Sequence, residues 1–246
     1  SVLPILLMFA VSSFSYNIPF ESAPIGLLTV PGAVLHTLLE WSAICIALCT
    51  VAFAFSHFSV KHDMISPVIG TAVFFSAMID AFQVLAVDGL LMTVHDRPDF
   101  VAITWAMSRT FYICLLIAGT APFTKRPTPT GAFITVRGTR FMLLSGILFV
   151  AMAYAIIYIL ASSTNLPSPF FPDFPIPRPW DLLPLILFLL AGGIVFPRFD
   201  RWNPSLFAKG LIVSTAPNVA AQMHMAYGSK AVYDENFYIA LYLKII

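Results

Sequence analysis

Charged side chains are scarce in this chain, since Asp, Glu, Lys and Arg make up only 10% of its 246 residues. Soluble globular domains are ordinarily about a quarter charged, so the composition excludes an ordinary soluble domain. The net charge of +1 provides no basic or acidic field that would indicate a nucleic-acid partner. What is abundant is apolar: 59% of the residues are hydrophobic and the mean hydropathy is +0.88, which indicates an integral membrane protein.

Cysteine is also scarce, and its placement excludes two further classes of protein. Cys45, Cys49 and Cys114 lie inside apolar runs and form no Cys-x-x-Cys pair, so neither a disulfide framework nor a zinc knuckle is supported. The sequence contains no HExxH, GxSxG or Ser/His/Asp signature that we can place. We therefore expect no catalytic activity in this chain.

Apolar runs near 20 residues long are the main feature that is present. About 20 helical residues cross the roughly 30 Å hydrocarbon core of a bilayer. The sequence predicts about eight transmembrane helices in one all-α bundle, with a single domain over residues 1–246 and no soluble domain. The predicted spans are 2–15, 34–58, 65–87, 102–123, 140–162, 181–197, 205–225 and 234–246.

The basic residues between these spans are unequally distributed, which predicts the orientation of the bundle. Loops on one side hold eight of them: Lys61, Lys125, Arg126, Arg137, Arg140, Arg198, Arg201 and Lys244. The opposite side holds three: Arg97, Arg178 and Lys230. Cytoplasmic loops carry the excess of Lys and Arg, so both termini are predicted to be cytoplasmic, in a bacterial inner membrane.

Eight polar residues fall inside the predicted spans at one depth, in the outer half of the membrane. They are His36, Glu40, Asp80, Gln83, Arg109, Asn218, Gln222 and His224. Within a span, the spacings i, i+3 and i, i+4 place two side chains on one face of the helix. Lipid does not solvate such faces, so we expect them to turn inward and line an outward-facing polar pocket.

Several interpretations of this pocket stay open. His36, Glu40, Asp80 and His224 supply imidazoles and carboxylates, a set that suits a divalent transition metal as cofactor. In an organic-ligand site, the Arg109 guanidinium would hold a carboxylate at two points. A glutamate or histidine acting as general base on a metal-bound water would make the chain a membrane metallohydrolase. The structural alternative is a buried ion-pair network of Arg109 with Glu40 or Asp80 that only fixes helix register.

Four segments of the sequence resemble blocks of a known family. They read LHTLLEWSAICIALCTVAFAF, FFSAMIDAFQVLAVDGL, ITWAMSRTFYICLLIAG and APNVAAQMHMAYGSKAVYDENFYIALYLKII. In that order they resemble bacterial multi-pass membrane-associated sensor (MASE-like) domains, the input modules of histidine kinases, diguanylate cyclases or adenylate cyclases. The resemblance covers somewhat over half of the chain.

The resemblance implies a sensor that detects a ligand, a metal or a membrane state and signals to a cytoplasmic output domain, usually as a dimer. By position it singles out five of the polar residues already named, His36, Glu40, Asp80, Arg109 and His224. Relatives often carry histidine where this sequence has Gln83 and Leu241, and a further histidine near Asn236. An amide is a poor ligand for these metals and leucine is none, so the difference weakens the metal interpretation.

The leading hypothesis is a membrane-embedded sensory module whose pocket signals through the last helix, with Lys244 at its cytoplasmic end. Its expected partners are membrane lipids, a small ligand or metal ion, and a second copy or other membrane subunits, with no nucleic acid. The alternatives are an accessory structural subunit of a larger membrane complex and the membrane metallohydrolase.

Overall fold

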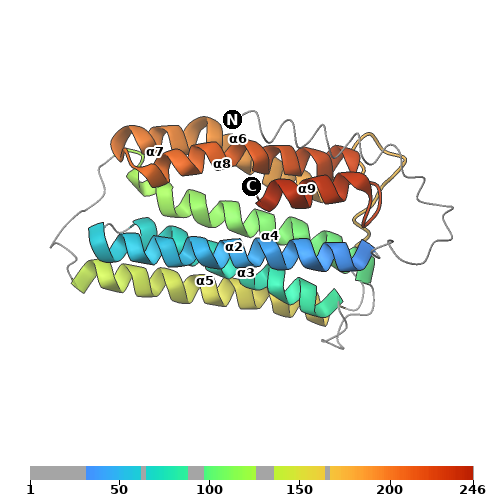
Figure 1. The fold of residues 1–246 in the computed structure, drawn as a ribbon, viewed down its shortest axis with the longest axis horizontal. Helices are drawn as coiled ribbons and strands as arrows, with labels where there is room; N and C mark the ends of the chain where they lie inside the picture. The colour runs from blue at the N-terminus through green and yellow to red at the C-terminus, as the bar shows by residue number, and fades with distance from the viewer. Residues whose placement is uncertain (1–31, 62–64, 88–96, 126–135, 164–166, 246) are drawn as a thin grey trace.

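A computed structural model describes residues 32–61, 65–87, 97–125, 136–163 and 167–245. Every regular element in these ranges is helical, and the long helices lie side by side in a bundle (Figure 1). The fold class, all-α, is therefore as predicted. The predicted span 2–15 lies outside the described residues.

Four long helices form the first part of the bundle. They are α2 (Gly32–Lys61), α3 (Ile65–Val87), α4 (Arg97–Thr120) and α5 (Val136–Ser162). Each contains most of a predicted span, but α4 begins at Arg97 instead of residue 102. Pro98 and Asp99 explain the early start, because proline suits a first helical turn and a carboxylate there interacts favourably with the helix dipole.

The second part of the chain is interrupted by two π segments. In order, the elements are α6 (Leu182–Leu190), the π segment η3 (Ala191–Val195), α7 (Phe196–Trp202), α8 (Leu206–Met223), the π segment η4 (His224–Gly228) and α9 (Glu235–Ile245). The predicted span 181–197 ends too early, since the helical path continues to Trp202. Pro197 has no N–H to donate, but it lies in the first turn of α7, just after the π segment, where a proline does not interrupt the helical path.

The outer surface of the bundle is apolar, as a bilayer requires. Phe53, Leu144 and Val213 are 73%, 67% and 71% exposed. Among the described residues, four segments are long and apolar enough to cross a membrane: Val34–Val60, Ile65–Ala86, Asp99–Phe123 and Pro179–Trp202. The count of eight spans and the cytoplasmic position of both termini stay predictions.

Helix packing brings the last helix into the middle of the bundle. α9 packs against α8 and against α2, and α2 in turn packs along α3 (Figure 1). One apolar cluster joins Leu39 of α2, Trp105 of α4, Met225 of η4 and Phe237 of α9. Elements from both ends of the described chain therefore meet around the N-terminal turns of α2.

The π segment η3 and helix α8 approach each other closely at Gly192 and Thr215. A Cβ atom added at Gly192 would lie 2.3 Å from Cγ2 of Thr215, a buried residue of α8. Only glycine leaves room for this contact, whereas the neighbouring Gly193 faces open space.

Candidate functional site

Asp80 of α3 lies at the centre of a buried network of charges. One carboxylate oxygen accepts a hydrogen bond from Ser108 Oγ at 2.6 Å. The other lies 2.9 Å from Arg109 Nη2 and 2.9 Å from Lys244 Nζ. Asp80 is 4% exposed and Arg109 is 6% exposed, so these contacts replace the water that both groups have lost.

Glu40 of α2 is tied to the same network through the last helix. Lys244 Nζ, on α9, donates to Glu40 Oε2 at 2.6 Å while it also contacts Asp80. The side chains of Lys244 and Glu40 are 5% and 0% exposed. One ammonium therefore bridges carboxylates from two helices, and the four charges of Glu40, Asp80, Arg109 and Lys244 sum to zero.

An aromatic residue of α4 lies beside both cations. The Arg109 guanidinium carbon lies 5.4 Å from the centroid of the Trp105 indole, and Lys244 Nζ lies 5.1 Å from the same centroid. The guanidinium carbon also lies 5.6 Å from the Tyr112 ring. These are cation–π distances, and the rings compensate part of the hydration that the cations lose on burial.

Local sequence explains why Lys244 reaches this position. Asp234 caps α9, because its carboxylate accepts the backbone N–H of Phe237 at 2.8 Å. Phe237, Ala240, Leu241 and Lys244 follow at helical spacing, and the first three are fully or almost fully buried. Lys244 continues this buried face, which points its stem and ammonium inward instead of to a surface.

This location corrects one sequence prediction. Lys244 was expected in a cytoplasmic loop at the end of the last span, but it lies in the buried network with Glu40 and Asp80. The eleven residues of α9 rise about 16 Å, roughly half of the hydrocarbon thickness, so Lys244 shares the depth of the predicted polar layer. The number of loop cations on the predicted cytoplasmic side falls from eight to seven as a result.

His36 is buried one helical turn from Glu40, but its surroundings are aromatic. Its ring lies 5.4 Å from the Tyr233 ring and 5.7 Å from the Phe237 ring. His36 is 0% exposed, and neither ring nitrogen has a hydrogen-bond partner among the described residues. Tyr233 has a φ of 69°, a strained value for a bulky residue, in the turn that leads into α9.

The other predicted site residues are spread around the network. Gln83 of α3 and Gln222 of α8 are 0% exposed, and their amide groups have no hydrogen-bond partner in the described part of the chain. Asn218 donates from Nδ2 to the Ser214 carbonyl at 2.8 Å. His224 is half-buried in η4, where its Nδ1 pairs with Asn236 Oδ1 at 2.9 Å.

The predicted metal set is not brought together. No group of three or more His, Cys, Asp or Glu side chains among the described residues has a geometry that would hold a metal ion. Glu40 and Asp80 meet cations, His36 meets aromatic rings, and His224 meets an amide. The metal prediction is therefore not supported by the arrangement of these residues.

A second buried ion pair lies outside the predicted layer. Arg178 Nε is 2.8 Å from Asp181 Oδ2, and both residues are almost completely buried. Arg178 also donates from its backbone N–H to the Ala226 carbonyl in η4 and from Nη2 to the Ala102 carbonyl of α4. Arg178 was counted as a loop cation, but it fastens the segment before α6 to α4 and η4.

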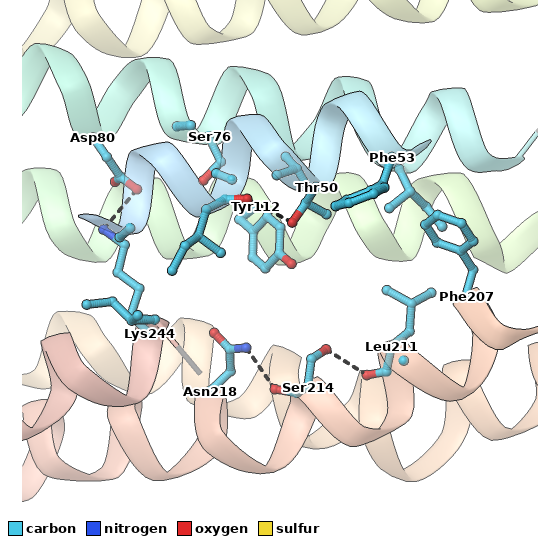
Figure 2. Close-up of a pocket in the computed structure, with 18 of the residues that line it drawn as sticks. Thr50, Phe53, Ser76, Asp80, Tyr112, Phe207, Leu211, Ser214, Asn218 and Lys244 are labelled. Carbon is cyan, nitrogen blue, oxygen red and sulfur yellow. Dashed lines mark hydrogen bonds and ion pairs between the residues drawn. The ribbon is translucent and has the colours of Figure 1, made fainter. Parts of the chain in front are cut away.

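A cleft of about 790 Å³ opens from the network and runs between α2 and α8. Asp80 and Lys244 lie at one end of it, and Phe53 and Phe207 lie at the other (Figure 2). Asn218 and Ser214 of α8 face it from below in the view, and Thr50 and Tyr112 line it from above (Figure 2). The cleft therefore has a charged end and a long body whose walls are mostly apolar, with hydroxyl and amide groups at intervals along it.

A comparison with protein families settles what kind of domain this is. Residues 33–246 match the model of MASE3, a membrane-associated sensor domain, which is most of the chain. The chain belongs to the MASE3 family. No curated protein and no solved structure gives a match. This MASE3 domain is therefore a sensory module of a membrane, as the resemblance implied, and its buried charge network includes three residues that the sequence had singled out.

Proposed function

We propose that this chain is a sensory module in which ligand binding at the buried network changes the position of α9. The observation that carries the proposal is the bridge made by Lys244. This residue belongs to α9, yet its ammonium is held by Glu40 of α2 and Asp80 of α3. Anything that alters the network therefore acts directly on the last helix.

The energetics make α9 suited to two discrete positions. If α9 shifts so that Lys244 leaves the network, the Arg109 guanidinium is the one cation that remains to balance the two carboxylates of Glu40 and Asp80. Breaking a buried ion pair in this way costs about 3–5 kcal/mol, so intermediate positions are disfavoured. A ligand that bonds to Lys244 or Arg109 in only one position of α9 would shift the equilibrium between the two positions. The size of the shift is set by the difference in the ligand's affinity for them.

The cleft gives a ligand access to these cations. Arg109, Lys244 and Asp80 all line its charged end. Arg109 Nε is buried and has no hydrogen-bond partner among the described residues. The protein therefore leaves one donor of this guanidinium unmatched, and a rearrangement of the network that pairs this donor with an acceptor would gain a hydrogen bond.

A second candidate function is that of an accessory structural subunit of a larger membrane complex. It is favoured by how fully Asp80 is satisfied, since Ser108, Arg109 and Lys244 all bond to it. In that case the network fixes helix register, and α9 has a single position.

Hydrogen exchange measured by mass spectrometry on the chain in nanodiscs separates the two functions. The sensory function predicts that amides of α9 open at lower free energy than those of α4, and that Glu40→Gln lowers protection in α9 alone. Lys209→Met, at an exposed lysine of α8, is the matched control and leaves protection unchanged. Equal protection of α9 and α4 in both proteins would contradict the sensory function.

A further inference from the structure

The cleft beside the network has a shape that selects an elongated ligand. It is lined by α2 from Ala43 to Val60, and the 17 helical steps between these residues rise about 26 Å. Its volume is about 790 Å³, within the range of small-molecule sites. A compact polar ligand would fill only the charged end, and the apolar walls of the rest of the cleft would not be covered by it.

The body of the cleft suits a flexible apolar chain. Its walls carry Ile46, Val73, Leu211 and Phe207, while Ala43 and Gly210 leave space between them. A Cβ atom at Gly210 would meet no atom within 4 Å, so this part of the cleft is open. Apolar tail atoms placed here gain contact on both sides, from α2 and from α8.

The charged end sets the chemistry of the ligand head. Glu40 and Asp80 balance Arg109 and Lys244, so a head group with a net charge would leave one charge uncompensated at membrane depth, where it is costly. Arg109 and Lys244 both line this end of the cleft, and both side chains donate hydrogen bonds. The end therefore favours a head that is neutral and accepts hydrogen bonds.

Aromatic side chains add a preference for a flat head. Tyr112 lines the cleft at its charged end, and its ring lies 5.6 Å from the guanidinium carbon of Arg109. A conjugated ring placed beside Tyr112 would stack on it while a carbonyl oxygen accepts from Arg109.

We infer that the cleft binds a neutral lipid of the quinone type, with its carbonyl-bearing ring at Arg109 and Lys244 and its tail between α2 and α8. This inference rests on the proposed sensory function and names the ligand class of the same site. Fatty acids differ in carrying an anionic head. Phospholipids differ in carrying a charged phosphate on a bulky, non-planar head group, which cannot stack on Tyr112. A protein helix differs in excluding any small ligand from the cleft.

Trp105 provides a direct reporter of this binding, because its indole lies beside both cations. A protein with Trp41, Trp180 and Trp202 changed to phenylalanine retains Trp105 as its one tryptophan. In phosphatidylcholine nanodiscs, titration with an oxidised benzoquinone carrying a decyl tail is expected to quench Trp105 saturably. Decanoate, which is also apolar-tailed but has an anionic head, is expected to compete weakly.

Two variants and one control locate the ligand. Arg109→Lys keeps the charge but replaces the forked guanidinium donors by a single ammonium. Gly210→Leu fills the open body of the cleft. Each is expected to weaken quinone binding about tenfold or more, as expected for loss of one hydrogen bond to a charged group or of the tail contacts. Gly146→Leu, at a glycine of α5 that also faces open space, is the matched control and leaves binding unchanged.

Three results would overturn the inference: quenching that does not saturate, equal binding of decanoate and quinone, or binding that is unaffected by Gly210→Leu. Hydrogen exchange of α9 is measured on the same samples. If α9 opens separately while the quinone fails to bind, the ligand class is wrong and the sensory function is retained. If α9 does not open separately, the sensory function itself fails.

Discussion

Replacement of Lys244 by methionine tests the buried network most sharply. Methionine retains the length and apolar stem of lysine but removes the ammonium, which lies 2.6 Å from Glu40 and 2.9 Å from Asp80. Two buried carboxylates then share the single cation Arg109. Removing one partner from a buried ion pair costs about 3–5 kcal/mol, so we expect Lys244→Met to lower the free energy of unfolding by this amount.

A second change should recover part of this loss. In the double variant Lys244→Met/Glu40→Gln, the remaining charges are Asp80 and Arg109, which still pair at 2.9 Å. The network is again neutral, so the double variant should lose less stability than the sum of the two single variants, by about 1–3 kcal/mol. The difference between the double variant and the sum of the two single variants is the coupling free energy between Glu40 and Lys244.

The assay is reversible unfolding of the purified chain in mixed micelles, with dodecyl sulfate as denaturant. Lys209→Met is the control, because it removes an exposed lysine from α8 and should change the unfolding free energy by less than about 0.5 kcal/mol. The reasoning is refuted if Lys244→Met costs no more than Lys209→Met, or if the losses of the two single variants add in the double variant.

Two other substitutions test the packing that supports the network, both by the same unfolding assay. Gly192→Ala places a Cβ atom 2.3 Å from the Thr215 side chain and should cost about 1–3 kcal/mol, whereas Gly193→Ala, which faces open space, should be neutral or stabilising. Equal effects at the two glycines would contradict the close approach. Ser205→Ala removes the side chain that accepts the Ala208 N–H at 3.1 Å and should cost about 1 kcal/mol, and no loss would show that α8 does not need this cap.

The helices of this protein were predictable because apolar runs and helix-start residues determine them locally. The spans predicted at 34–58 and 65–87 coincide closely with α2 and α3. The end of the predicted span 181–197 was wrong because the span was defined by its apolar run, which stops before Arg198. In the structure the helical path continues through Pro197, which lies in the first turn of α7 after the π segment, to Trp202.

The meeting of Glu40, Asp80 and Arg109 was predictable from depth, because buried charges need partners. Lys244 was missed because a lysine near the end of a span is ordinarily assigned to a loop. One signal was available in the sequence. Glu40 and Asp80 carry two negative charges and Arg109 supplies one positive charge, so the layer lacked a cation that only another helix could provide.

His224 shows what spacing along a chain does not determine. It follows Gln222 closely and was placed in the same pocket, but α8 changes at His224 into the π segment η4, and its imidazole pairs with Asn236 of α9. A widened turn alters which way the following side chains face, and no residue pattern in the sequence indicates it. The metal set depended on His224 and His36 turning toward the carboxylates, which neither does.

The central claim is that the buried network controls the position of α9, and a distance measured between α2 and α9 tests it most directly. Spin labels at Leu38→Cys and Tyr242→Cys, both at exposed positions, report this distance once Cys45, Cys49 and Cys114 are changed to serine. Pulsed electron resonance in nanodiscs should show two distance populations whose ratio shifts on Asp80→Asn and not on Lys209→Met. A single population that is identical in all three proteins would contradict the account.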